Sequence, residues 1–210
     1  MKRFLVFGDS WPYGSELDFT KEKPFPNLFA QQHSLDFKSY CVPSTGIPHL
    51  VIQLEKAIND GHRDCIGLFC LSSTSRSIMY DKKRWKEIHV NNTDPGSIAY
   101  FKYIHSLELD NFTSNSYILA LQRICQQHNI EDYYISCWSK LNLYLPGIDK
   151  SKFFEEGNTT FVDILECGNH LPDMDTSINA KHHTIYPNQC HPNYHGHQIL
   201  ADQLHKWIKT

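Results

Sequence analysis

The sequence predicts an α/β domain whose sheet is mostly parallel and covered by helices on both faces. Short runs made entirely of apolar residues alternate along the chain with segments of helical periodicity. Continuous apolar runs are typical of parallel strands that are buried on both faces. Their alternation with amphipathic helices is typical of α/β folds.

The N-terminal half supplies two strands and one helix of this pattern. Residues 4–7 form an apolar run that ends at Gly8, and residues 66–71 form a second one. Between them, residues 48–59 begin with proline and place leucine or isoleucine four positions apart, which predicts an amphipathic helix closed by Asp60 and the glycine after it. We expect functional residues where such strands end.

The C-terminal half continues the alternation. A helix is predicted over residues 114–128, with Ser114 and Ser116 as candidate caps, and a strand over residues 133–138 follows directly. Apolar residues near helical spacing from 194 to 208 predict a terminal helix that packs on the sheet.

All 210 residues fit a single compact domain. Two long stretches interrupt the alternation of predicted strands and helices. Residues 77–112 are rich in aromatic side chains, and residues 139–190 are rich in Asn, Gly, Pro and His. Loops of this length in a compact domain are usually functional or disordered. We interpret the aromatic stretch as a cover on the substrate side.

Composition and charge are those of a globular protein. The net charge is -3 and the basic residues are scattered, which does not favour a nucleic acid or an anionic membrane as a partner. No run approaches the roughly 20 apolar residues of a membrane-spanning helix, and the first apolar run is too short for a signal peptide. The 7 cysteines lack framework spacing and several lie in apolar runs, so we expect reduced thiols and a cytoplasmic location.

The strongest local motif is the segment Phe-Gly-Asp-Ser-Trp-Pro-Tyr-Gly at residues 7–14. It places Ser10 directly after the first strand, where a serine can expose its hydroxyl at the sheet edge. Serine is a weak nucleophile and needs a base to accept its proton. The alternative is that Asp9 and Ser10 only cap a helix.

A second motif favours catalysis. The segment Cys-His-Pro-Asn-Tyr-His-Gly-His begins at residue 190, just before the terminal helix, and contains a candidate base, His191. The two motifs together resemble the first and last sequence blocks of the SGNH (GDSL-type) esterase superfamily. In that family the first block supplies the nucleophile and the last block supplies the base.

The resemblance implies a role for several residues of this chain. Ser10 matches the nucleophile and His191 the base. The backbone N–H groups of Ser10 and Gly46 match donors of the oxyanion hole, with Ser44 as an alternative alignment for Gly46. Thr74 stands where the family has an asparagine that also donates to the oxyanion.

Further residues are expected near the substrate. Asp9, Ser73 and Arg76 are candidate substrate contacts, although a surface salt bridge is an equally good interpretation of Arg76. Three residues before His191 the family has an aspartate that orients the imidazole, and this chain has Asn188. An asparagine carbonyl still accepts from the imidazole, but it brings no negative charge.

A carboxylate from elsewhere in the chain is an alternative to Asn188, and Asp173 and Asp175 are candidates. The 13 histidines do not match a common zinc pattern, so neither a metal nor another cofactor is expected. His197 is expected to pack or cap at the terminal helix.

The resemblance therefore implies a three-layer α/β/α sandwich with a flavodoxin-like sheet. The implied activity is hydrolysis of a small ester through an acyl-enzyme. The long polar and aromatic stretches favour a carbohydrate ester, such as an O-acetylated sugar, over a long acyl chain. Two alternatives stay open: an O-acyltransferase of the same fold, and a catalytically impaired domain that binds glycan. The sequence does not determine the oligomeric state.

Overall fold

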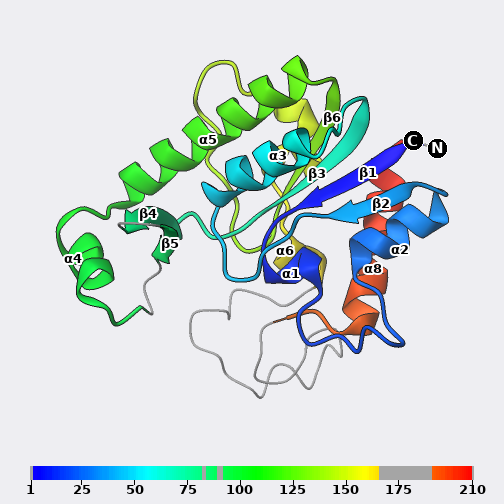
Figure 1. The fold of residues 1–210 in the computed structure, drawn as a ribbon, viewed down its shortest axis with the longest axis horizontal. Helices are drawn as coiled ribbons and strands as arrows, with labels where there is room; N and C mark the ends of the chain where they lie inside the picture. The colour runs from blue at the N-terminus through cyan, green and yellow to red at the C-terminus, as the bar shows by residue number, and fades with distance from the viewer. Residues whose placement is uncertain (1, 82–83, 89–91, 166–190, 210) are drawn as a thin grey trace.

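A computed structural model describes residues 2–81, 84–88, 92–165 and 191–209. Its central sheet contains β1 (Arg3–Phe7), β2 (Asp36–Ser39), β3 (Cys65–Leu71) and β6 (Ile130–Ser136). These strands are all parallel and lie in the order β2-β1-β3-β6 (Figure 1). The predicted α/β fold with a parallel sheet is therefore confirmed.

Helices cover both faces of this sheet. One face packs against α2 (Phe25–Gln32), α6 (Phe161–Ile164) and α8 (Tyr194–Trp207). The other face packs against α3 (His49–Asn59) and α5 (Leu107–Gln127). The result is the three-layer α/β/α sandwich (Figure 1).

The alternation of side chains along β1 explains why a strand so apolar is needed. Phe4 and Val6 lie in the core under α2 and α8, whereas Leu5 and Phe7 lie in the core under α3. All four side chains are 0% exposed. A strand between two helical layers has no face for polar residues.

Two of the predicted elements have bounds that differ clearly from those in the structure. The helix expected over 114–128 begins earlier, at Leu107, because Ser106 accepts a hydrogen bond from the N–H of Leu109 and caps it. The strand expected over 133–138 is β6, which begins at Ile130 and ends at Ser136.

The helix α2 and the strand β2 are among the elements that the sequence did not predict. The helix α2 begins at a Pro-Phe-Pro segment, and β2 has the sequence Asp-Phe-Lys-Ser. The strand β2 lies at the edge of the sheet, and its side chains are exposed or half-buried. An edge strand needs no continuous apolar run, so the periodicity search does not find it.

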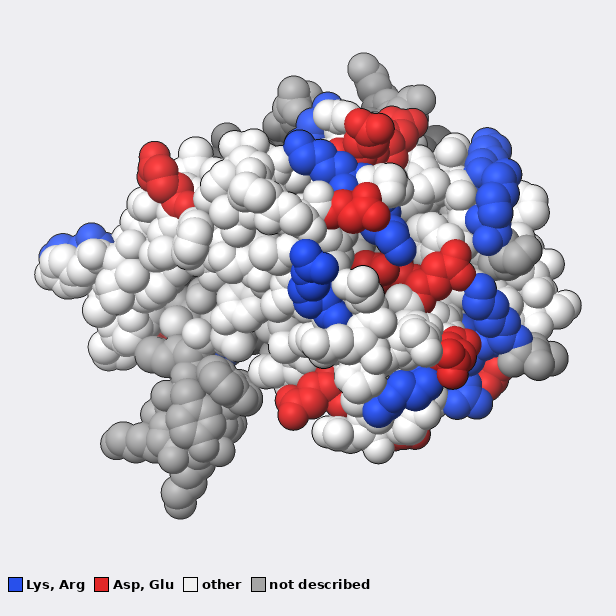
Figure 2. Space-filling model, turned by 90° about the horizontal axis from the view of Figure 1, so that it is seen from above, with Lys and Arg blue, Asp and Glu red and all other residues white. Residues whose placement is uncertain are grey.

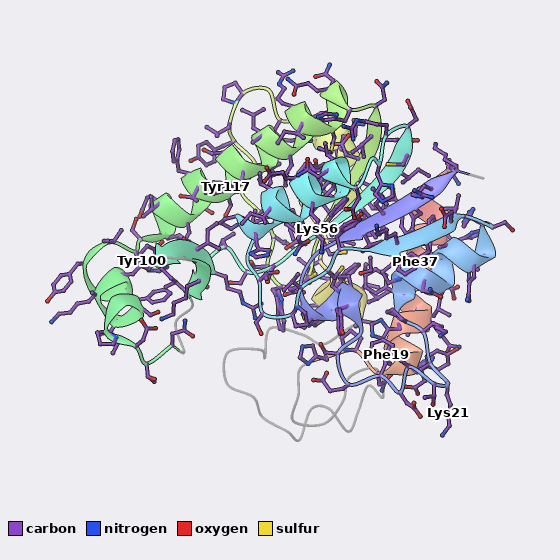
Figure 3. All side chains as sticks on the ribbon, in the orientation of Figure 1. Phe19, Lys21, Phe37, Lys56, Tyr100 and Tyr117 are labelled. Atoms are coloured by element: carbon purple, nitrogen blue, oxygen red, sulfur yellow. The ribbon has the colours of Figure 1, made fainter. Side chains whose placement is uncertain are left out.

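The aromatic stretch 77–112 contains secondary structure of its own. It forms an antiparallel hairpin of β4 (Ser77–Asp81) and β5 (Arg84–Ile88), the helix α4 (Pro95–Tyr103) and the start of α5. In Figure 1 these elements extend to one end of the molecule, away from α1 (Ser10–Tyr13), and Tyr100 marks α4 in Figure 3. The interpretation of this stretch as a cover on the substrate side stays a prediction.

The stretch 139–190 is described up to residue 165. It contains two short 3-10 helices, η1 (Lys150–Lys152) and η2 (Phe154–Gly157), and then α6. Its apolar side chains Leu143, Phe153 and Phe161 are buried in the core. This part of the stretch is therefore part of the domain rather than a separate loop.

The face of the molecule shown in Figure 2 carries charges of both signs. Lys and Arg side chains lie interspersed with Asp and Glu over the face shown in Figure 2. Within the described ranges, no helix is both long and apolar enough to cross a membrane.

The described cysteines are buried and form no disulfide bond with one another; they are at positions 41, 65, 70, 125 and 137.

The histidine His197 joins α8 to α2. Its side chain is 0% exposed, its ring stacks on Phe25, and its Nδ1 accepts a hydrogen bond from the N–H of Phe25 at 3.2 Å. The expectation that it packs at the terminal helix is confirmed. Burial, with a smaller effect of the neighbouring His191, lowers the pKa of His197 from 6.5 to about 3.

This shift predicts a loss of stability in mild acid. Since the unfolded chain takes up a proton near pH 6.5 and the folded protein does not, the stabilisation is complete above that pH and is lost as the pH falls toward 3. The contribution of His197 falls by about 1.4 kcal/mol per pH unit in this window. Urea unfolding near pH 7 and pH 5 should show a smaller acid loss in His197→Gln than in the parent. The exposed His195→Gln on the same helix is the control; an equal acid loss in all three proteins contradicts the prediction.

Candidate active site

The side chain of Ser10 lies where the sequence placed it. It is the first residue of α1, which begins three residues after the carboxyl end of β1. Asp9 caps this short helix by accepting a hydrogen bond from the N–H of Trp11 at 3.1 Å. Trp11 is 0% exposed and packs against Trp138 and Phe161, so α1 is fixed to the core under Ser10.

The turn between β1 and α1 depends on Gly8. The side chain of Gln53 on α3 donates to the carbonyl of Gly8 and accepts from its N–H, both at 2.9 Å. A Cβ atom on Gly8 would lie 2.5 Å from Cγ of Pro12 and 3.0 Å from Cβ of Cys70. Only glycine lets the chain pass so close to β3 before it turns toward Ser10.

The imidazole of His191 contacts Ser10 directly. Nε2 of His191 lies 2.8 Å from Oγ of Ser10, although the two residues are 181 positions apart. This distance is within the range that we expected for a nucleophile and its base, about 2.6–3.2 Å. His191 stands just before α8, which begins after Asn193 accepts a hydrogen bond from the N–H of Gly196.

The other nitrogen of the His191 ring faces a carboxylate that the sequence did not single out. Nδ1 of His191 lies 2.7 Å from Oε2 of Glu16, and the side chains are 21% and 27% exposed. The contact has the distance of an ion pair but not the geometry of a regular hydrogen bond. The residues that we expected here, Asn188, Asp173 and Asp175, lie outside the described residues.

A buried ion pair lies beside α1. Oδ2 of Asp9 accepts hydrogen bonds from Oγ of Ser72 at 2.7 Å and from Nη1 of Arg76 at 3.1 Å. Asp9 is 0% exposed and the Arg76 side chain is 24% exposed. Arg76 was expected as a substrate contact or a surface residue. Its salt bridge is with a buried carboxylate, and Ser72 is a partner that the sequence did not suggest.

The burial of Asp9 limits what it can do. Its carboxylate binds Ser72, Arg76 and the N–H of Trp11, and no part of the residue is exposed to solvent. Any influence of Asp9 on a substrate therefore passes through Arg76. Within the described chain, every hydrogen bond of the Arg76 guanidinium uses Nη1.

Gly46 packs directly against Arg76. A Cβ atom on Gly46 would lie 2.5 Å from the carbonyl oxygen of Arg76. Nη1 of Arg76 also reaches the carbonyl of Thr45, at 3.4 Å. The loop that contains Gly46 and the segment after β3 are thus held together beside Asp9.

The residues proposed for the oxyanion hole lie on three segments: the start of α1, the loop that contains Gly46 and the segment after β3. Among the described residues, the backbone N–H groups of Ser10 and Gly46 have no hydrogen-bond acceptor. Thr74 is half-buried, and the hydroxyl of Ser73 is engaged with Oγ of Ser75 at 2.8 Å. Ser44 is exposed and has φ of 67°, so its side chain is not part of the packing around Arg76.

Three thiols lie in the core near Asp9, and none has the character of a nucleophile. Burial raises the pKa of Cys41, Cys70 and Cys137, and the charge of Asp9 raises it further. Since the thiolate is the reactive form, these cysteines behave as small apolar side chains.

Comparison with known proteins identifies the fold. No protein-family model and no curated protein matches the sequence. Solved structures do match: the psychrotrophic esterase EstA from a Pseudoalteromonas species has a TM-score of 0.53 at 11% identity, over 99% of this chain and 97% of that one. A member of the lipolytic G-D-S-L family from Veillonella parvula has a TM-score of 0.50 at 11% identity, over 98% and 97%.

A further similar structure is the acetyl xylan esterase AlAXEase, with a TM-score of 0.51 at 12% identity over 98% of this chain and 100% of that one. These neighbours are two esterases and a member of the lipolytic G-D-S-L family, each matched over nearly the whole chain. The chain therefore has the SGNH hydrolase fold.

The buried pair of Asp9 and Arg76 predicts a coupled loss of stability. Arg76→Met leaves the Asp9 charge in the core without a cation and should lower the free energy of unfolding by about 3 kcal/mol. Asp9→Asn in the same protein removes that charge, so the double variant should be more stable than Arg76→Met alone. Urea unfolding of the four proteins measures the coupling. If the losses of unfolding free energy in the two single variants simply add up to the loss in the double variant, the predicted coupling between Asp9 and Arg76 is wrong.

Proposed function

We propose that this protein is a serine esterase that works through an acyl-enzyme on Ser10, with His191 as general base. The observation that carries the proposal is the 2.8 Å contact between Oγ of Ser10 and Nε2 of His191. Two residues from opposite ends of the chain meet in the geometry of proton transfer, at the sheet edge where α/β proteins place their sites.

The chemistry follows from this pair. Nε2 of His191 accepts the proton of Ser10 as Oγ attacks the ester carbonyl, and the imidazolium then donates that proton to the departing alcohol. Water, deprotonated by the same nitrogen, attacks the acyl-enzyme carbonyl, and the imidazolium returns the proton to Oγ of Ser10 as its bond to the acyl group breaks and the acid leaves. Each half-reaction returns His191 to its neutral form.

The negative charge on the attacked oxygen needs donors. We assign the N–H groups of Ser10 and Gly46 to this role, since neither has an acceptor among the described residues, together with the hydroxyl of Thr74. Arg76 lies against Gly46, and its Nε and Nη2 are the donors that we assign to a polar group of the substrate.

For the substrate we propose an ester with a small acyl group, with an O-acetylated carbohydrate as the class. Beside Ser10, the buried Asp9 and Ser72 hold Arg76, and the Arg76 side chain, which is 24% exposed, is the group of this polar cluster that can face a substrate. A polar cluster suits a hydroxyl-rich alcohol and offers little to a long acyl chain. Among the structural neighbours, one is an acetyl xylan esterase.

Covalent labelling tests the activated serine without knowledge of the substrate. A fluorophosphonate should add once to the intact parent protein, at Ser10, and should not add to Ser10→Ala. In His191→Gln the rate should fall by at least about 10³-fold, because the serine loses its base. Ser116→Ala, on the exposed side of α5, should react like the parent. Mass spectrometry gives the result, and an unlabelled parent or a labelled Ser10→Ala refutes the esterase proposal.

A series of p-nitrophenyl esters tests the small acyl group. A buried methylene contributes about 0.8 kcal/mol, so a site with an apolar channel favours octanoate over acetate. We expect the opposite here: kcat/KM for the acetate should be at least as high as for the octanoate, and acetate should be released from acetylated xylan. A steady rise of kcat/KM with chain length contradicts this substrate class. It leaves the assignment of Ser10 and His191 intact.

A further inference from the structure

The loop that follows Ser10 contains Glu16, whose carboxylate contacts the His191 ring. We propose that Glu16 is the positioning residue for His191, holding the proton on Nδ1 so that Nε2 is free to accept from Ser10. The proposal rests on the esterase function proposed above. In this proposal the acidic residue lies on the loop that follows Ser10 and not on the segment that contains His191.

Backbone contacts fix Glu16 relative to Ser10. The carbonyl of Ser10 accepts hydrogen bonds from the N–H of Gly14 at 3.0 Å and from the N–H of Ser15 at 3.1 Å. Gly14 ends α1 in a left-handed conformation, with φ of 83°. Glu16 therefore follows directly after a residue that is bonded to the nucleophile itself.

The other side of Glu16 is also anchored. Leu17 is 7% exposed, and its N–H donates to the carbonyl of Gly14 at 3.2 Å. The loop then runs on to α2, where the N–H of Phe25 is bonded to His197 on α8; Phe19 and Lys21 mark this loop in Figure 3. The loop is thus fixed to both the nucleophile and the helix that follows the base.

The backbone of Glu16 adopts a conformation that few side chains favour. Its φ is 71°, in the left-handed region. A residue other than glycine held there costs of order 1 kcal/mol or more. In this conformation the carboxylate reaches Nδ1 of His191 at 2.7 Å.

The charges around His191 favour Glu16 over the other nearby carboxylate. The charge of Asp9 is compensated by Arg76, with Ser72 and the N–H of Trp11 as further partners. Glu16 has His191 as its partner within the described residues. His197, which also faces His191, has its pKa lowered to about 3 by burial and is neutral at ordinary pH.

This arrangement supplies what an aspartate near the histidine supplies in other triads. A carboxylate at Nδ1 fixes the tautomer and stabilises the imidazolium that forms when Ser10 attacks. Since the Glu16 side chain is 27% exposed, solvent weakens the effect. We therefore expect a smaller loss on removal than the roughly 10⁴-fold loss known for a buried triad aspartate.

The test compares Glu16→Gln, Glu16→Asp and a matched control, Glu22→Gln. Glu22 lies in the same loop, where its carboxylate accepts from the N–H of Asp18, and has no contact with His191. For p-nitrophenyl acetate, kcat should fall about 10- to 1000-fold in Glu16→Gln with KM little changed. Glu16→Asp keeps the charge and should retain part of kcat, and Glu22→Gln should match the parent.

A second readout does not depend on activity. Nitrogen-15 NMR of the imidazole, assigned by the resonances lost in His191→Gln, reports which ring nitrogen carries the proton. The parent and Glu22→Gln should hold it on Nδ1, and Glu16→Gln should shift it toward Nε2. An unchanged tautomer and unchanged kcat in Glu16→Gln overturn the role of Glu16. A parent protein that fluorophosphonate does not label overturns the esterase function instead, and the tautomer measurement still decides the role of Glu16.

Discussion

The buried carboxylate of Asp9 is the constraint on which the arrangement of this site depends. A charge that is 0% exposed must be paired, because an unpaired charge in the core costs several kcal/mol. Its partners come from three places: the N–H of Trp11 in α1, the hydroxyl of Ser72 after β3, and the guanidinium of Arg76. Satisfying Asp9 therefore brings the ends of β1 and β3 together, and Arg76 draws in the loop of Thr45 and Gly46.

The parallel sheet supplies the platform for these contacts. Phe7 pairs with Phe69 and Leu71 with Ser136, so β1, β3 and β6 end at the same edge. Gln53 holds both backbone groups of Gly8 at this edge, and α1 leaves it with Ser10 as its first residue. His191 lies on a separate segment, just before α8, and contacts Ser10 because α8 packs in the same layer as α2.

Sequence reasoning predicted best the strands and helices whose pattern of apolar residues is determined by burial. The apolar strands around residues 4–7 and 66–71, the helix over 48–59 and the terminal helix were predicted close to their observed bounds, because burial on both faces leaves a clear pattern. It missed the helix α2, and it missed the strand β2 because an edge strand needs no apolar run. It also missed the hairpin and α4, because aromatic residues at irregular spacing are compatible with several local structures.

The sequence by itself determined the fold class and the two residues that meet at the site, Ser10 and His191, because each lies in a local motif next to a predictable element. Only the tertiary structure decided which groups surround them. Glu16, Ser72 and Gln53 stand in no motif, and their roles arise from contacts at 2.7–2.9 Å between segments distant in the chain. Such contacts depend on how the layers pack and on the conformation of single residues, such as the left-handed Glu16, and local sequence patterns do not encode either.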